Sequence, residues 1–134
     1  MATKKVLVVD DEEAIVKVVK RRLEGSAYTV ITAADRAEAL QKARAEKPDL
    51  IISDITMPNM DGYTFVNTLR STPEGAETPI IILTVKENLR DLFKSHGIKH
   101  CDYLLKPFKS EDLLKRVDAY LRPEVDGASP TPVQ

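Results

Sequence analysis

The feature that most constrains the fold of this chain is the regular alternation of short apolar runs with helical patterns. The runs are rich in β-branched residues and lack strict polar–apolar alternation, which is typical of strands that are covered on both faces of a sheet. They are Val6–Val9, Val30–Ile31, Leu50–Ile52, Ile80–Leu83 and, later in the chain, Tyr103–Leu105.

Apolar residues recur at helical spacing in the intervals that follow these runs. The first helix places Ile15, Val18, Val19 and Leu23 on one face, and Gly25 is its expected C-terminal stop. The other patterns are Asp35 and Glu38 as a capping box before Ala39, Leu40 and Ala43; Phe65, Val66 and Leu69; Leu89, Leu92 and Phe93, ending near Gly97; and Leu113, Leu114, Val117, Tyr120 and Leu121, ending before Pro123. This order predicts an α/β fold, in which right-handed crossovers connect the strands of a parallel sheet.

Length and composition are consistent with one soluble domain. Of the 134 residues, 1–122 are expected to form the domain, and 123–134 a flexible proline-rich tail or the beginning of a truncated linker. The formal net charge is -1 with dispersed basic residues, so we expect binding to neither nucleic acid nor a membrane surface. No apolar run is long enough to span a bilayer, and the single cysteine, Cys101, cannot form an internal disulfide. A cytoplasmic location is the expectation.

Polar side chains stand where the predicted strands end. Asp10 and Asp11 follow the first strand, Asp54 follows the third, Thr84 ends the fourth, and Lys106 follows the fifth. Ligands of open parallel sheets bind outside the carboxyl ends of the strands, so these side chains can converge on one crevice. They do so if the first, third, fourth and fifth strands are neighbours in that order.

Three carboxylates in one crevice repel each other, and a hard divalent cation resolves the conflict. Mg²⁺ prefers oxygen ligands and commonly shares its shell with a phosphate. The pattern therefore indicates phosphoryl transfer, with Asp54 as the carboxylate nucleophile and Asp10 and Asp11 as metal ligands. Lys106 and Thr84 would then contact the phosphoryl oxygens.

Four segments of the chain resemble the response-regulator receiver domain of bacterial two-component signalling. They are Val8–Glu12, Asp54–Gly62, Ile81–Thr84 and Asp102–Phe108, and they occur in the order and at the spacing of that family. The resemblance extends over about residues 4–122. It implies a (βα)5 doubly wound, flavodoxin-like sandwich with the strand order 2-1-3-4-5 that chemotaxis receivers have.

The resemblance also implies a reaction. A partner histidine kinase or phosphotransfer protein would phosphorylate Asp54 with Mg²⁺ as the cofactor and Mn²⁺ as an alternative. Asp11, Asp54 and the backbone carbonyl of Thr56 would bind the metal directly, and Asp10 mostly through water. Self-phosphorylation and slow autodephosphorylation would be the only catalysis, so the chain is not expected to act as an enzyme on external substrates.

A conformational switch is a further implication of the resemblance. Thr84 would swing toward the phosphoryl group, Tyr103 would turn inward, and a cis peptide bond between Lys106 and Pro107 would direct the lysine into the site. A downstream protein would bind the face formed by the fourth helix, the fifth strand and the fifth helix. The chain would be a monomer or a phosphorylation-dependent dimer.

Two positions that vary within this family, here Thr56 and Lys86, are expected to tune the lifetime of the phosphoryl group. Lys86 either lies over that group and alters water access, or is a solvated lysine at a helix start. Measuring phospho-Asp54 decay in Lys86→Ala separates these alternatives. Val85 departs from the small residue usual in the family, and its bulk could narrow the entry for a phosphoryl donor.

Other functions remain open from the residues alone. A Mg²⁺-dependent phosphohydrolase with an aspartyl-phosphate intermediate would need a cap or substrate pocket, for which short connections leave little room. An adaptor of the same fold that no longer switches would not need the complete polar set at the strand ends. A zinc site at His96, His100 and Cys101 lacks a fourth ligand nearby.

Overall fold

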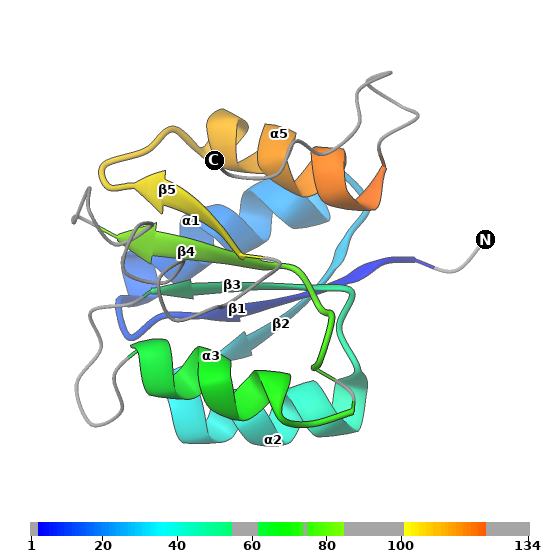
Figure 1. The fold of residues 1–134 in the computed structure, drawn as a ribbon. Coiled ribbons are helices and arrows are strands. Elements are labelled where there is room, and N and C mark those ends of the chain that lie inside the picture. Colours follow the sequence, from blue (N-terminus) through cyan, green and yellow to red (C-terminus); the bar gives the residue numbers. More distant parts are fainter. Residues whose placement is uncertain (1–2, 55–61, 74, 85–100, 123–134) are drawn as a thin grey trace.

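The computed structural model describes residues 3–54, 62–73, 75–84 and 101–122 (Figure 1). Several predicted features lie outside these ranges. They are Thr56, Val85, Lys86, the helix with Leu89, Leu92 and Phe93, the two histidines of the zinc hypothesis, and the tail 123–134.

Each predicted apolar run forms a strand, and the strands belong to one five-stranded sheet. The strands are β1 (Lys5–Val9), β2 (Thr29–Ala33), β3 (Leu50–Asp54), β4 (Ile80–Thr84) and β5 (Cys101–Leu105). Their order across the sheet is β2-β1-β3-β4-β5, and all neighbouring pairs are parallel. The predicted flavodoxin-like order is therefore confirmed, and the carboxyl ends of all strands lie at one edge.

Helices cover both faces of this sheet, as Figure 1 shows. They are α1 (Glu13–Glu24), α2 (Arg36–Glu46), α3 (Gly62–Arg70) and α5 (Ser110–Leu121). The pair α1 and α5 packs on one face, and α2 and α3 pack on the other. None of the helices in the described part of the chain is long and apolar enough to cross a bilayer.

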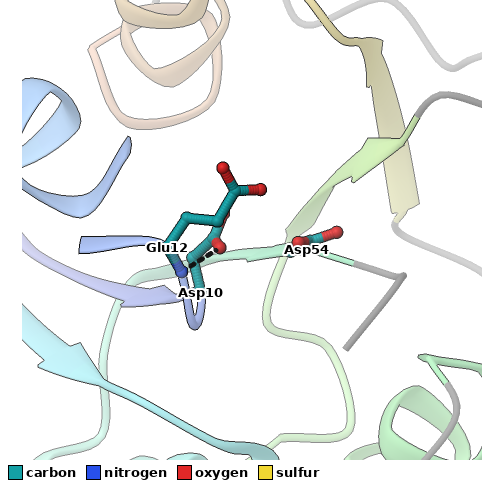
Figure 2. A group of neighbouring side chains, drawn as sticks. All are labelled: Asp10, Glu12 and Asp54. Atoms are coloured by element: carbon teal, nitrogen blue, oxygen red, sulfur yellow. Dashed lines mark hydrogen bonds between the residues drawn. The ribbon is translucent and has the colours of Figure 1, made fainter. Parts of the chain in front are cut away.

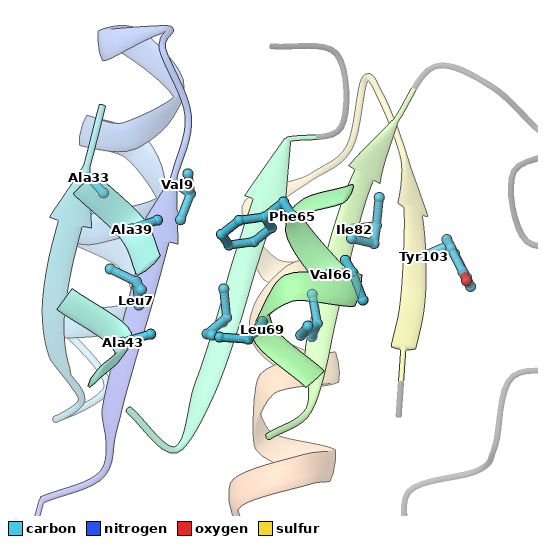
Figure 3. Packing of buried hydrophobic residues seen from close by; sticks show 12 residues of the cluster. Leu7, Val9, Ala33, Ala39, Ala43, Phe65, Val66, Leu69, Ile82 and Tyr103 are labelled. Atoms are coloured by element: carbon cyan, nitrogen blue, oxygen red, sulfur yellow. The ribbon is translucent and has the colours of Figure 1, made fainter. Parts of the chain in front are cut away.

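Two hydrophobic clusters separate these layers, because successive strand residues point to opposite faces. In β1, Val6 and Val8 belong to the cluster under α1 and α5, whereas Leu7 and Val9 belong to the cluster under α2 and α3. Figure 3 shows the second cluster, in which Phe65 and its neighbours on α3 lie against the central strands. Because both faces of the sheet are buried, the strands appear in the sequence as continuous apolar runs.

The first helix differs from its sequence prediction at two positions. Val18, expected on the buried face with Val19 and Leu23, is 55% exposed. The helix ends at Glu24, as predicted, yet Gly25 keeps a right-handed conformation (φ -64°). Ala27, with φ 70°, is the residue of this turn that adopts the left-handed conformation.

The capping box of α2 is present with one change. The carboxylate of Asp35 accepts a hydrogen bond from the Glu38 N–H at 2.8 Å, as an N-cap does. The Glu38 carboxylate accepts from the N–H of Ala34 at 2.9 Å, one residue before the usual partner. Lys42 adds a hydrogen bond to the carbonyl oxygen of Thr32 and an ion pair with Glu38. The first turn of α2 is therefore firmly attached to the end of β2.

Candidate phosphorylation and metal site

The strand ends bring four of the predicted residues to one edge of the sheet. Asp54 and Thr84 are the last residues of β3 and β4, while Asp10 and Lys106 directly follow β1 and β5. Asp54 and Thr84 are each 1% exposed and Asp10 is 2% exposed. The parallel register of β1, β3, β4 and β5 is the cause of this convergence.

Three carboxylates gather here, and one of them was not predicted. Asp10, Glu12 and Asp54 each offer an oxygen atom within 4.8 Å of the others (Figure 2). The backbone N–H of Glu12 donates to Asp10 Oδ1 at 2.9 Å, which holds the turn after β1. Asp11 is exposed and is not a member of this group, so its role as a direct metal ligand stays a prediction. Consecutive acidic residues carry no sequence signal that tells which side chain faces inward.

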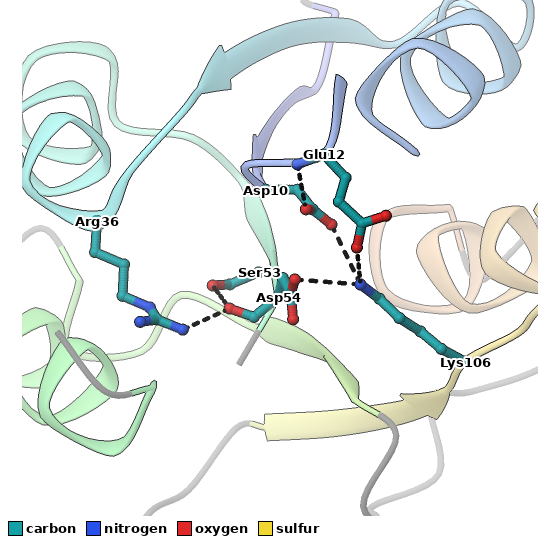
Figure 4. A network of polar contacts seen from close by, with 6 residues as sticks. All are labelled: Asp10, Glu12, Arg36, Ser53, Asp54 and Lys106. Atoms are coloured by element: carbon teal, nitrogen blue, oxygen red, sulfur yellow. Dashed lines mark hydrogen bonds and ion pairs between the residues drawn. The ribbon is translucent and has the colours of Figure 1, made fainter. Parts of the chain in front are cut away.

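Lys106 connects these carboxylates (Figure 4). Its Nζ lies 3.2 Å from Asp54 Oδ2, 3.6 Å from Asp10 Oδ2 and 3.6 Å from Glu12 Oε1. Its backbone N–H donates to the carbonyl oxygen of Thr84 at 2.8 Å, which extends the β4–β5 pairing by one residue. One ammonium therefore faces three acidic groups, and the site has an excess of negative charge.

Burial sets the electrostatics of this site. Burial raises the pKa of Asp10 to about 6, an increase that the nearby charges of Asp54 and Glu12 support. The Glu12 N–H and the Lys106 ammonium oppose that rise only in part. Burial alone would lower the pKa of Lys106, but the charges of Asp10, Asp54 and Glu12 outweigh it and the pKa is raised. The lysine is therefore protonated at neutral pH, and the carboxylates lack a matching positive charge.

The donor set fits a hard divalent cation. Asp10 Oδ2 is buried and, within the described residues, accepts no hydrogen bond, which is costly for a carboxylate oxygen. A cation among the three carboxylates would satisfy that oxygen and neutralise the excess charge. Oxygen-only ligands are those that Mg²⁺, Mn²⁺ and Ca²⁺ prefer, so the residues present could hold such an ion.

The two residues of the predicted switch belong to the neighbouring strands β4 and β5. Thr84 is buried at the end of β4, and Tyr103 in the middle of β5 is 9% exposed. Tyr103 lies at the β5 edge of the cluster in Figure 3. The Lys106–Pro107 peptide bond is cis, as the resemblance implied. The movement of Thr84 and Tyr103 stays a prediction.

Two contacts to the main chain of Asp54 were not foreseen. Nη2 of Arg36 donates to the Asp54 carbonyl oxygen at 2.8 Å, and Ser53 Oγ donates to the same oxygen at 3.1 Å. Arg36 is the first residue of α2 and only 2% exposed. A helix pattern assigns a residue to a face of its own helix, so it contains no information about a contact to the end of β3.

The sequence of the chain is similar to a known family and to curated proteins. The family model of the response regulator receiver domain matches residues 6–118. The chain is 44% identical over 119 residues to the alkaline phosphatase synthesis transcriptional regulatory protein PhoP of Bacillus subtilis (strain 168), covering 89% of this chain and 49% of that protein. It is 38% identical over 118 residues to the response regulator MprA of Mycobacterium ulcerans (strain Agy99), covering 88% of this chain and 50% of that protein.

Solved structures give the same result. The chemotaxis protein CheY4 of Vibrio cholerae superposes with a TM-score of 0.81 at 39% identity, covering 89% of this chain and 99% of that one. The receiver domain of the sensor histidine kinase PA1611 of Pseudomonas aeruginosa PAO1, solved with a magnesium ion coordinated in its active-site cleft, superposes with a TM-score of 0.78 at 29% identity. It covers 90% of this chain and 98% of that one. The present chain spans about half the length of the curated relatives it matches. On its sequence and its sheet order, the chain belongs to the family of response regulator receiver domains.

Proposed function

We propose that the chain is a phosphoryl-accepting signal receiver, in which Asp54 takes a phosphoryl group from a phosphohistidine of a partner histidine kinase or phosphotransfer protein. The observation that carries this proposal is the position of Asp54. Its buried carboxylate lies 3.2 Å from the Lys106 ammonium and beside two further carboxylates that could hold a metal. A purely structural aspartate would not need a second and third carboxylate at the same strand edge.

The reaction is a direct displacement at phosphorus. A carboxylate oxygen of Asp54 forms the new P–O bond while the P–N bond to the donor imidazole breaks. The electron pair of that bond returns to the imidazole nitrogen, which is protonated from solvent, and Asp54 becomes an acyl phosphate. A bound Mg²⁺ would supply neutralisation of the negative charge on the phosphoryl oxygens. Asp10 and Asp54, together with Asp11 or Glu12 and the predicted Thr56 carbonyl, would hold it.

The side chains around Asp54 supply orientation and charge. Lys106 Nζ, which contacts Asp54 Oδ2 before the reaction, would donate to an oxygen of the added phosphoryl group. The hydroxyl of Thr84, at the end of the adjacent strand, would donate to another oxygen. This movement and the inward turn of Tyr103 would shift the population toward a conformation that a downstream partner binds on a face including β5 and α5. No external substrate is turned over in this scheme, and we propose a cytoplasmic setting.

Intact-mass spectrometry with acetyl phosphate as a small-molecule donor tests the proposal. Wild-type protein with Mg²⁺ is expected to gain one phosphoryl group, and the gain is expected to disappear with a chelator or in Asp54→Asn. Lys106→Met should retain the fold and lose most of the gain. A phosphoryl group that is still acquired by Asp54→Asn contradicts the assignment of the acceptor. Size-exclusion chromatography of both forms distinguishes a monomer from a phosphorylation-dependent dimer.

A further inference from the structure

We propose that Arg36 is a positioning residue for Asp54, which holds the main chain of the phosphoryl acceptor from the first turn of α2. The inference rests on the proposed function, since it assumes that Asp54 is the acceptor. It concerns a residue that does not touch the reacting oxygens and that contributes nothing to the helix pattern of its own segment. The contact is the hydrogen bond from Arg36 Nη2 to the Asp54 carbonyl oxygen.

The location of Arg36 is unfavourable for an arginine on two counts. Its side chain is 2% exposed, and a guanidinium that leaves water is costly unless it is paired. It is also the first residue of α2, where the positive end of the helix dipole disfavours a cation. Neither helix propensity nor solubility therefore explains a buried arginine here. Hydrogen bonds to fixed acceptors offset that cost, and the Asp54 carbonyl oxygen at 2.8 Å is one such acceptor.

The helix turn that carries Arg36 is itself well anchored. Asp35 caps α2, Glu38 accepts from the N–H of Ala34, and Lys42 reaches the carbonyl oxygen of Thr32. These bonds attach the start of α2 to the end of β2. A guanidinium that extends from an anchored turn has few alternative positions, so the hydrogen bond restrains Asp54 and does not simply follow its movements.

Asp54 is thereby held from two sides, as Figure 4 shows. Arg36 and Ser53 Oγ contact its carbonyl oxygen, while Lys106 contacts its carboxylate from the opposite side. Asp54 is the last residue of β3, where it is paired with Leu83 of β4. A carbonyl oxygen that two donors hold restrains the main chain at Asp54, and with it the Cα from which the carboxylate extends toward Lys106. Small displacements of a reacting group slow group transfer strongly, by about a hundredfold for a displacement of roughly 1 Å.

The experiment measures the initial rate of Asp54 phosphorylation against acetyl phosphate concentration at saturating Mg²⁺. Arg36→Met keeps most of the buried volume and removes the donor. We expect its maximal rate to fall by about tenfold or more, with a donor concentration at half-maximal rate close to that of wild type. Arg36→Lys, which keeps a cationic donor on a shorter side chain, should recover part of the rate.

Two controls separate positioning from stability and charge. Arg44→Met removes the same charge from an exposed site on α2 and should leave the rate unchanged. Ala43→Gly, in the buried face of α2, destabilises the helix without touching Asp54 and should also leave the rate unchanged below its unfolding transition. Equal maximal rates for Arg36→Met and wild type overturn the inference about Arg36 and do not affect the proposed function of Asp54. The inference is also overturned if Ala43→Gly, with a matching loss of stability, loses as much rate as Arg36→Met. If wild type acquires no phosphoryl group, the proposed function fails and the role of Arg36 fails with it.

Discussion

Replacing Asp10 by asparagine should make the metal-free protein more stable, although it removes a side chain of the site. Burial, with the nearby charges of Asp54 and Glu12, raises the pKa of the Asp10 carboxyl from 3.8 to about 6. The folded protein therefore resists ionisation of this group, and above the raised pKa it carries an unfavourable negative charge. Asparagine removes the charge and keeps the Oδ1 acceptor for the Glu12 N–H, which lies at 2.9 Å.

The size of the effect follows from the pKa change. Each tenfold change in a proton-binding constant is about 1.4 kcal/mol, so the rise to about 6 corresponds to roughly 3 kcal/mol. The sign follows from proton binding, because the folded state holds the proton more tightly than the unfolded state. Well below pH 3.8 the Asp10 carboxyl is protonated in both the folded and the unfolded wild type, and the variant is no more stable than the wild type. Between about pH 4 and pH 6 the wild type loses stability relative to the variant, and above about pH 7 the full difference is present.

Urea denaturation followed by circular dichroism, with a chelator present and at several pH values from 4 to 8, measures this difference. Asp11→Asn is the matched control, because it removes the same charge from an exposed neighbouring position and should change stability by less than about 0.5 kcal/mol. Adding Mg²⁺ should stabilise the wild type more than Asp10→Asn, because the metal binds the folded carboxylates. A variant that is no more stable than the wild type at pH 7, or a gain that is independent of pH, would refute the reasoning.

Three further predictions concern Lys106, the N-cap of α2 and the Cys101 thiol. Lys106→Met removes the only ammonium that contacts Asp10, Glu12 and Asp54 among the described residues. The free energy of unfolding of the metal-free protein, measured by urea denaturation, should therefore fall by about 3 kcal/mol, and Mg²⁺ should restore part of it. Unchanged stability contradicts the ion-pair description. Asp35→Ala removes the N-cap of α2 and should cost about 1 kcal/mol by calorimetry, whereas Asp35→Asn, which keeps an acceptor, should cost less. Burial raises the pKa of the Cys101 thiol from 9.0 to about 11. At pH 8 a thiol-specific reagent should therefore react with the folded protein about a hundredfold more slowly than with the urea-unfolded chain. Similar rates would show that the thiol is accessible and ionises normally.

Much of the fold could be predicted because its determinants are local. Short β-branched runs are the signature of strands buried on both faces, and all of them form strands of the one sheet. The meeting of the side chains at the strand ends could be predicted equally well, since a parallel sheet places the carboxyl ends of its strands together. Asp10, Asp54 and Lys106 meet for that reason. The order of the strands came from the family resemblance and not from the residues alone.

The features that could not be predicted depend on contacts between distant segments or on single torsion angles. Helical spacing placed Val18 on the buried face, but the neighbouring elements leave it 55% exposed. Between Asp11 and Glu12, the turn after β1 decides which carboxylate reaches Asp54. The burial of Arg36 follows from how α2 lies against the end of β3, which no local pattern contains.

The central claim is that Asp54 itself becomes the acyl phosphate. Acyl phosphates, unlike free carboxylates, are reduced by borohydride, which converts the modified aspartate to homoserine. Wild-type protein treated with acetyl phosphate and Mg²⁺, then reduced and digested, should yield a peptide with homoserine at position 54 and unmodified aspartate at positions 10 and 11. Homoserine at either of those positions, or at none of the three in protein shown by intact mass to carry a phosphoryl group, would contradict the account.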